Sequence, residues 1–100
     1  SVNEILKIEP EYALAYYYKA IGCYFVKDMN GFKENIQRSL EYFPEFKDAL
    51  LDYGVYLMNN QNTEEAKVKF SKVLEMDPAN KIALINLNSL KDSVKAPVKK

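Results

Sequence analysis

The sequence contains no histidine and only one cysteine, Cys23. Without histidine, the chain cannot use an imidazole for acid–base catalysis, for activating a serine or cysteine nucleophile, or for binding a transition metal. A single cysteine excludes an intramolecular disulfide and a cysteine-clustered zinc site. We therefore expect no enzymatic activity and no cofactor, and we interpret Cys23 as a small packed hydrophobic residue in a reducing compartment.

The sequence also lacks an excess of charge of either sign and a long apolar run. Fourteen basic residues balance fourteen acidic ones, so nothing favours nucleic acid or an anionic membrane surface as the main partner. No apolar run approaches the roughly 18 residues needed to span a bilayer, and no secretory signal opens the chain. We expect the cytoplasm and no membrane insertion. The chain opens at Ser1 without an initiator methionine, so an upstream targeting segment could have been removed.

What the sequence does contain is a period of 34 residues. Pro10, Pro44 and Pro78 stand 34 residues apart, twice over. Two further columns keep the same period, namely Ala15, Ala49 and Ala83, and Leu6, Leu40 and Leu74. One hundred residues, 48% of them hydrophobic, predict a single domain in which helix pairs bury their apolar faces by stacking.

Apolar spacing and turn residues predict about six helices. The expected segments are 1–8, as the end of a truncated unit, then 10–27, a shorter helix ending near 42, one after Pro44, 63–75 and 79–94. We expect tight turns at 28–31 and 59–62, with Asn62 or Thr63 capping the helix that follows. Residues 95–100 are expected to be disordered.

The register of helix 10–27 has two solutions. The 34-residue period places Tyr16, Lys19, Ala20 and Cys23 on its inward face, whereas a slide of two residues places Tyr18, Ile21, Gly22 and Phe25 there. We adopt the unshifted register, with this helix lengthened by about a turn before Gly31 and the following helix shortened. Phe32 then takes the position that Ala66 holds one period later.

Seven residues between Leu50 and Asn80 carry the anchor spacing of a known helical repeat. They are Leu50, Tyr53, Gly54, Leu57, Ala66, Phe70 and Pro78. The chain therefore resembles the tetratricopeptide repeat family. The resemblance implies an all-α, right-handed solenoid of antiparallel helix pairs, with full repeats at 13–46 and 47–80, the end of a truncated repeat at 1–10 and an opening or capping helix at 81–94. It also implies that the paired helix approaches Gly54 closely, which would offset a cost of roughly 1 kcal/mol in helix propensity.

In this family the first helices of successive repeats line a concave groove that binds peptides. The resemblance places the partner-binding groove at Leu14, Tyr17, Tyr18, Ile21 and Tyr24, at Asp48, Leu51, Asp52, Val55 and Asn59, and at Ile82, Ile85, Asn86 and Ser89. Independently of the resemblance, Leu51, Val55 and Met58 form a second apolar stripe on one helix. Such a helix is either buried on both sides or presents one side to a ligand. The alternative is that these residues pack against neighbouring helices.

Two negative expectations follow from the acidic residues. Relatives that bind the acidic C-terminal tails of chaperones use lysine, arginine and asparagine, whereas the corresponding positions here include Asp52, which would repel a carboxylate. The pairs Glu64–Glu65 and Asp48–Asp52 lack a third ligand type, and the first pair is explained by a helix N-terminus. We expect neither a chaperone-tail clamp nor a metal site.

The sequence thus predicts a protein-protein interaction module, a scaffold or adaptor that binds a peptide segment of another protein. We expect Asp48 and Asp52 to favour a basic or neutral ligand. Two alternatives stay open. The chain could be the substrate-recruiting repeat arm of a larger enzyme, or a structural fragment that self-associates through uncapped ends at Val2, Ile5, Ile82 and Ile85.

Overall fold

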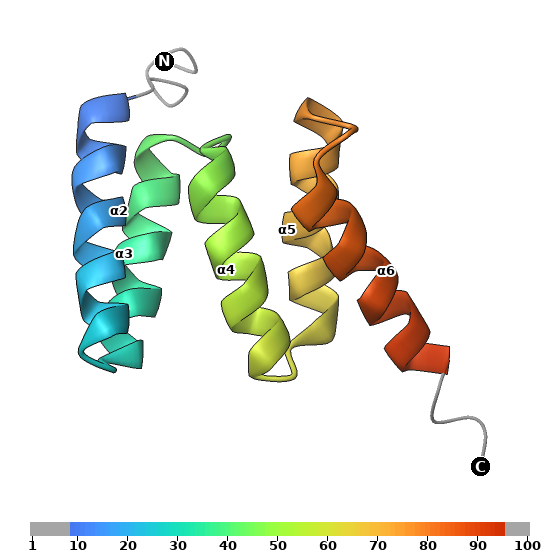
Figure 1. The fold of residues 1–100 in the computed structure, drawn as a ribbon. Coiled ribbons are helices and arrows are strands. Elements are labelled where there is room, and N and C mark those ends of the chain that lie inside the picture. The colour runs from blue at the N-terminus through green and yellow to red at the C-terminus, as the bar shows by residue number, and fades with distance from the viewer. Residues whose placement is uncertain (1–8, 96–100) are drawn as a thin grey trace. The chain divides into compact units, whose positions relative to one another are not determined.

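The chain is all-helical in a computed structural model that describes residues 9–95, with side chains described as far as Lys91. Within those residues there are five helices, labelled in Figure 1. They are α2 (Pro10–Phe25), α3 (Met29–Tyr42), α4 (Lys47–Asn59), α5 (Thr63–Met76) and α6 (Lys81–Lys95). The expected helix at 1–8 and the expected disorder of 96–100 lie outside the described residues, whereas Lys95 belongs to α6.

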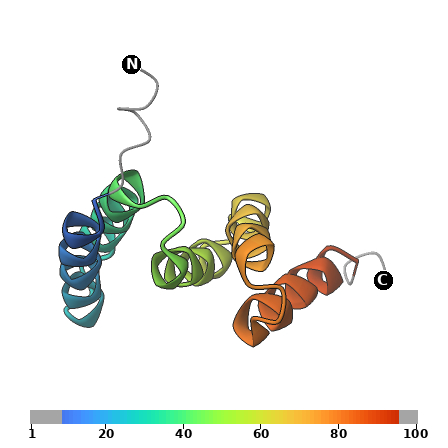
Figure 2. The same cartoon turned by 90° about the horizontal axis from the view of Figure 1, so that it is seen from above.

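Contacts divide the chain into two compact units, Ser1–Ala49 and Leu50–Lys100. In the first unit α2 and α3 lie side by side in both views (Figures 1 and 2). The backbone N–H of Glu9, just before α2, donates to the carbonyl of Tyr42 at the end of α3, 2.9 Å away. The two helices of this pair are therefore antiparallel, and the start of the first is tied to the end of the second.

Small residues let α2 and α3 approach each other closely. Ala13, Ala20 and Ser39 are all 0% exposed, and the Ser39 hydroxyl donates a 2.6 Å hydrogen bond to the Ala13 carbonyl on the other helix. Ile36, also 0% exposed, completes the apolar part of the contact. At the C-terminal end of α3, the Tyr42 ring stacks on the Tyr16 ring of α2, with 5.6 Å between the ring centroids.

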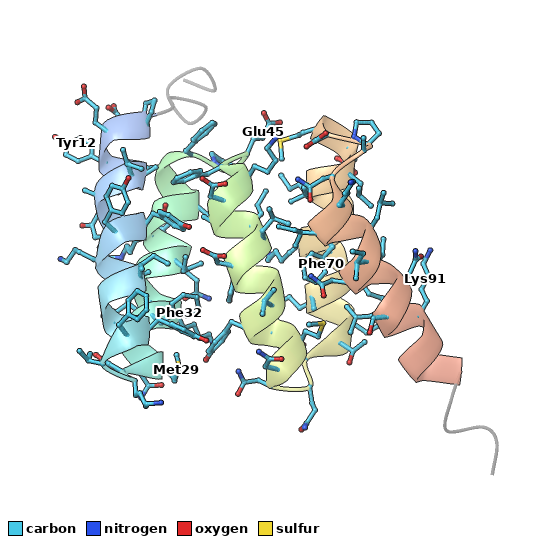
Figure 3. The ribbon with its side chains drawn as sticks, viewed as in Figure 1. Tyr12, Met29, Phe32, Glu45, Phe70 and Lys91 are labelled. Carbon is cyan, nitrogen blue, oxygen red and sulfur yellow. The ribbon has the colours of Figure 1, made fainter. Side chains whose placement is uncertain are left out.

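The second unit has its own core, built around Phe70. Phe70, Val73 and Ala66 of α5 are each 0% exposed, and Leu57 of α4 is 3% exposed. Figure 3 labels the Phe70 ring and the Phe32 ring, each of which is buried in its own unit. Helix α6 packs on α5 and contributes Ala83 and Leu90 to the buried set.

Burial along α2 agrees with the unshifted register at Ala20 and Cys23 but not at Lys19. Ala20 is fully buried and Cys23 half-buried, while Lys19 and the alternative candidates Gly22 and Phe25 are exposed. Lys19 tolerates its position because its Nζ reaches out over the Tyr16 ring, 5.4 Å from the centroid.

Three expectations about helix bounds are wrong. Met29, Asn30 and Gly31 are not a turn but the first turn of α3, because the Asp28 carboxylate caps that helix by accepting a 3.0 Å hydrogen bond from the Gly31 N–H. The longer α2 (16 residues, against 13 in α4) is not balanced by a shortened partner, since α3 and α5 both have 14 residues. Helix α6 begins at Lys81 rather than at Ala79, because the Asn80 side chain accepts from the Ala83 N–H.

Ala15 differs from the other alanines of its column. Ala49 and Ala83 are 0% exposed, whereas Ala15 is exposed and Ala13 is the buried alanine of α2. The expectation that all three alanines occupy equivalent positions is therefore wrong for Ala15. The small residue required at the α2–α3 contact is the one whose carbonyl receives the Ser39 hydroxyl.

Candidate functional site

Helix α2 has two apolar sides, of which only one is used for packing within its unit. The side that faces α3 carries Ala13, Tyr16, Ala20 and Cys23, as the contacts to Ser39, Tyr42 and Asn35 establish. With 3.6 residues per turn, Leu14, Tyr18, Ile21 and Phe25 fall on a different side of the helix. We call these four residues the α2 stripe.

The α2 stripe is largely open to solvent. Leu14 is 43% exposed, Tyr18 is 64% exposed and Phe25 is 76% exposed, while Ile21 is half-buried. Three of the four, Leu14, Tyr18 and Ile21, are predicted groove residues, and the structure brings them onto one face. Phe25 is not among the residues predicted for the groove, although its step of four from Ile21 continues the stripe.

The two other predicted groove residues of α2 lie at the edges of the stripe and also support the fold. Tyr17 is half-buried, and its ring lies 5.1 Å from that of Phe46 and 5.9 Å from that of Tyr18. Tyr24 is 54% exposed, yet its ring lies 5.7 Å from that of buried Phe32. Both rings are thus held in place by neighbours while part of each remains accessible.

Helix α4 offers a polar surface at most of the predicted positions. Asp48 and Asn59 are exposed, and Asp52 and Val55 are half-buried. Leu51, in contrast, is only 9% exposed and belongs to the core. A helix with two apolar stripes is either buried on both sides or presents one side to a ligand. At Leu51 the second stripe of α4 is buried, so this residue stabilises the fold and is not accessible to a ligand.

Helix α6 has an apolar surface at its N-terminal half. Ile82 is 52% exposed and Ile85 is 66% exposed, and their neighbour Leu84 is 40% exposed. Asn86 is half-buried and Ser89 is exposed. The predicted α6 residues therefore share one helix in the second unit, as the predicted α2 residues share one helix in the first.

A surface depression lies along α5 and is not formed by predicted site residues. Its lining is Glu64, Lys67, Val68, Ser71, Lys72 and Glu75. All of these come from a single helix, and the charged pair Lys67–Glu64 is separated by 3.3 Å. A face of one helix with mixed charges lacks the convergent groups that catalysis or small-molecule binding requires.

The described part of the chain contains no group of three or more acidic, histidine or cysteine side chains arranged to hold a metal ion. None of the helices in residues 9–95 is both long enough and apolar enough to cross a bilayer. The surface that distinguishes this chain is thus the exposed apolar face of α2, with a smaller one on α6.

Comparisons with protein-family models, with curated proteins and with solved structures gave no match.

Proposed function

We propose that the chain is a protein-interaction module of the tetratricopeptide type, which binds a peptide segment of another protein on the exposed face of its first helices. The observation that carries this proposal is the α2 stripe. Four large apolar side chains at helical spacing are left in contact with water on the side of α2 that its partner α3 does not cover. Contiguous exposed apolar surface of this kind marks interaction sites in folded proteins.

The 34-residue repeat that underlies the proposal has support in local structure. Helices α3 and α5 begin at Met29 and Thr63 and end at Tyr42 and Met76, so both bounds differ by 34 residues. The residues buried in α3, Phe32, Ile36 and Ser39, stand 34 before those buried in α5, Ala66, Phe70 and Val73. Two segments of unrelated sequence would not be expected to share both bounds and burial.

The turns that precede α3 and α5 repeat in the same way. Lys27 and Gln61 both have a φ of 65°. The N–H of Asp28 donates to the carbonyl of Cys23, and the N–H of Asn62 donates to that of Leu57, both at 2.8 Å. This is the Schellman pattern of a helix C-terminus, in which one left-handed residue reverses the chain. The same turn therefore joins the helices of both pairs.

The acidic residues of α4 bear on the chemistry of the ligand. Asp48 is exposed and Asp52 is half-buried, and both are among the groove positions that the family resemblance implies. Carboxylates attract basic groups and repel acidic ones. We therefore infer that the bound segment is apolar with basic or neutral flanking residues, and that acidic chaperone tails are not ligands.

Affinity selection from a displayed library of random 12-residue peptides, followed by calorimetric titration of a synthesised selected peptide, tests the proposal. Tyr18→Glu is expected to weaken binding about tenfold or more, because it places a charge in the centre of the apolar surface. Val68→Glu, at a 58% exposed position on α5, is the matched control and should leave affinity unchanged. Asp52→Lys should weaken binding of peptides with basic flanks. Failure to select any peptide, or equal effects of Tyr18→Glu and Val68→Glu, would refute the proposal.

A further inference from the structure

Gly31 occupies a position in α3 that leaves no room for a side chain. An ideal Cβ there would lie 2.8 Å from the Cys23 sulfur on α2 and 2.9 Å from Cγ of Asp28. The first contact comes from the packing of α3 on α2, and the second comes from the cap of α3, so the fold requires glycine here. The residue before it is Asn30, and together they form the one Asn–Gly pair of the sequence.

An Asn–Gly pair carries its own reactive groups. The backbone nitrogen of the glycine can attack the side-chain carbonyl carbon of the asparagine, because no side chain on the glycine shields that nitrogen. A bond forms between this nitrogen and Cγ, the bond from Cγ to Nδ2 breaks, and Nδ2 takes up the proton that the backbone nitrogen gives up and leaves as ammonia. Water then opens the five-membered imide at either carbonyl, which gives aspartate or isoaspartate. Asn30 is exposed, so water reaches the imide.

The folded structure restrains Gly31 on both sides. Its N–H donates to Asp28 Oδ1, 3.0 Å away, and its carbonyl accepts from Asn35 Nδ2, 2.8 Å away. Attack requires the Gly31 N–H to lose its proton, which would leave a second negative charge beside the Asp28 carboxylate. Closing the ring also requires Asn30 to leave the helical backbone conformation. Both steps are unfavourable while the first turn of α3 is intact.

We propose that Asn30–Gly31 is a deamidation site of this protein, and that Asp28 controls its rate by holding the attacking nitrogen. Reaction then proceeds through the open form of the first turn of α3, in which the hydrogen bond from Gly31 to Asp28 is broken. This inference goes beyond the proposed function and does not depend on it, because the reacting groups lie outside the α2 stripe.

The two products differ in their effect on α3. No acidic residue lies in the first turn of this helix, so aspartate at position 30 adds a negative charge at the positive end of the helix dipole. Isoaspartate instead adds a carbon atom to the main chain, which disrupts the hydrogen-bonding register of the first turn. Phe32, which is only 3% exposed, follows two residues later and loses packing when that turn is disrupted. The isoaspartate form is therefore expected to be the less stable of the two.

Mass spectrometry of the full chain, incubated at mildly alkaline pH and then digested, measures deamidation at each asparagine. The folded wild-type chain should react at Asn30 about tenfold or more slowly than the chain unfolded in urea. Asp28→Ala is expected to raise the rate in the folded chain about fivefold, the factor by which loss of an N-cap favours the open turn. Asp28→Ser keeps a capping oxygen and should react close to the wild-type rate. Asn30→Gln should abolish the reaction at this position, because its longer side chain would have to close a six-membered ring.

Ser39→Ala is the matched control, because it weakens the α2–α3 contact and leaves the cap of α3 in place. It should deamidate at the wild-type rate, and thermal unfolding shows that each variant is folded under the incubation conditions. If Ser39→Ala accelerates the reaction as much as Asp28→Ala does, or if Asp28→Ala leaves the rate unchanged, the cap does not control the reaction and the proposal is overturned. Equal rates at Asn30 in the folded and the urea-unfolded chain, or deamidation that maps to other asparagines only, also overturn it.

Discussion

The ring of Phe70 occupies the space that a side chain on Gly54 would need. An ideal Cβ at position 54 would lie 2.7 Å from Cζ of Phe70 and 2.8 Å from its Cε1. Both residues are buried, and Phe70 is 0% exposed. Helices α4 and α5 can therefore pack at this distance only because α4 carries glycine here, and the close approach that the family resemblance implied is confirmed.

Gly54→Ala is expected to be destabilising even though alanine is the better helix former. Phe70 is 0% exposed, so its ring can make room only by displacing packed neighbours, and the added methyl group costs about 1–3 kcal/mol of overpacking. Gly22→Ala is the matched control, because a Cβ there would meet no atom within 4 Å and the variant should gain about 0.5–1 kcal/mol. Urea unfolding of both variants measures the difference. Equal unfolding free energies of the two variants would mean that the Phe70 ring can move aside at little cost.

The same comparison shows what the sequence could and could not predict about glycine. The period singled out Gly54 because it occupies an anchor position of the repeat. Gly31 was interpreted as a turn residue from composition alone, yet it is helical, and a Cβ there would lie 2.8 Å from the Cys23 sulfur. A glycine among polar residues is typical both of a turn and of a position where another helix approaches closely. Only the packing of α2 on α3 shows which of the two applies to Gly31.

Gln61→Gly is expected to stabilise the protein. Gln61 has a φ of 65°, in the left-handed region that costs a residue with a side chain about 1–2 kcal/mol. Glycine adopts this conformation without that cost but loses more conformational entropy on folding, so a net gain of about 0.5–1 kcal/mol is expected. Gln37→Gly, in the exposed interior of α3, should instead lose about 0.5–1 kcal/mol. Chemical unfolding of the pair tests the sign, and a loss at position 61 would contradict the interpretation.

Asp28→Ala is expected to cost more stability than Asn62→Ala, although the two residues occupy equivalent positions before α3 and α5. The Asp28 carboxylate accepts from the Gly31 N–H, whereas Asn62 makes no side-chain cap and instead donates to Glu65 Oε1 at 3.1 Å. Loss of a true N-cap costs about 1 kcal/mol, and loss of an exposed side-chain contact costs a few tenths. Thermal unfolding of both variants measures the two costs, and a larger effect at Asn62 would refute this assignment.

The sequence could predict which candidate site residues share a face of one helix, because helical periodicity determines this. The family resemblance placed Leu14, Tyr18 and Ile21 together, and their helical spacing puts them on one face in the structure. Leu51 was placed with them by register, but it is buried, because exposure depends on neighbouring helices and not on the position within one helix. Phe25 could have been found by extending the stripe one more step. The family analogy supplied the groove positions, whereas the exposed stripe on α2 comes from the packing of α2 on α3.

Ser39 gives the sharpest test of the α2–α3 contact. Its hydroxyl donates to the Ala13 carbonyl over 2.6 Å, and both residues are 0% exposed. Ser39→Ala removes a buried hydrogen bond worth about 1 kcal/mol but gains helix propensity of up to about 0.5 kcal/mol. Ser71→Ala, at an exposed position of α5, gains the propensity without losing a bond. The difference in unfolding free energy between the two variants therefore isolates the hydrogen bond, with Ser39→Ala expected to be the less stable by about 1 kcal/mol. If the two variants are equally stable, the Ser39 hydroxyl does not stabilise the helix pair, and close packing of small residues alone holds α2 on α3.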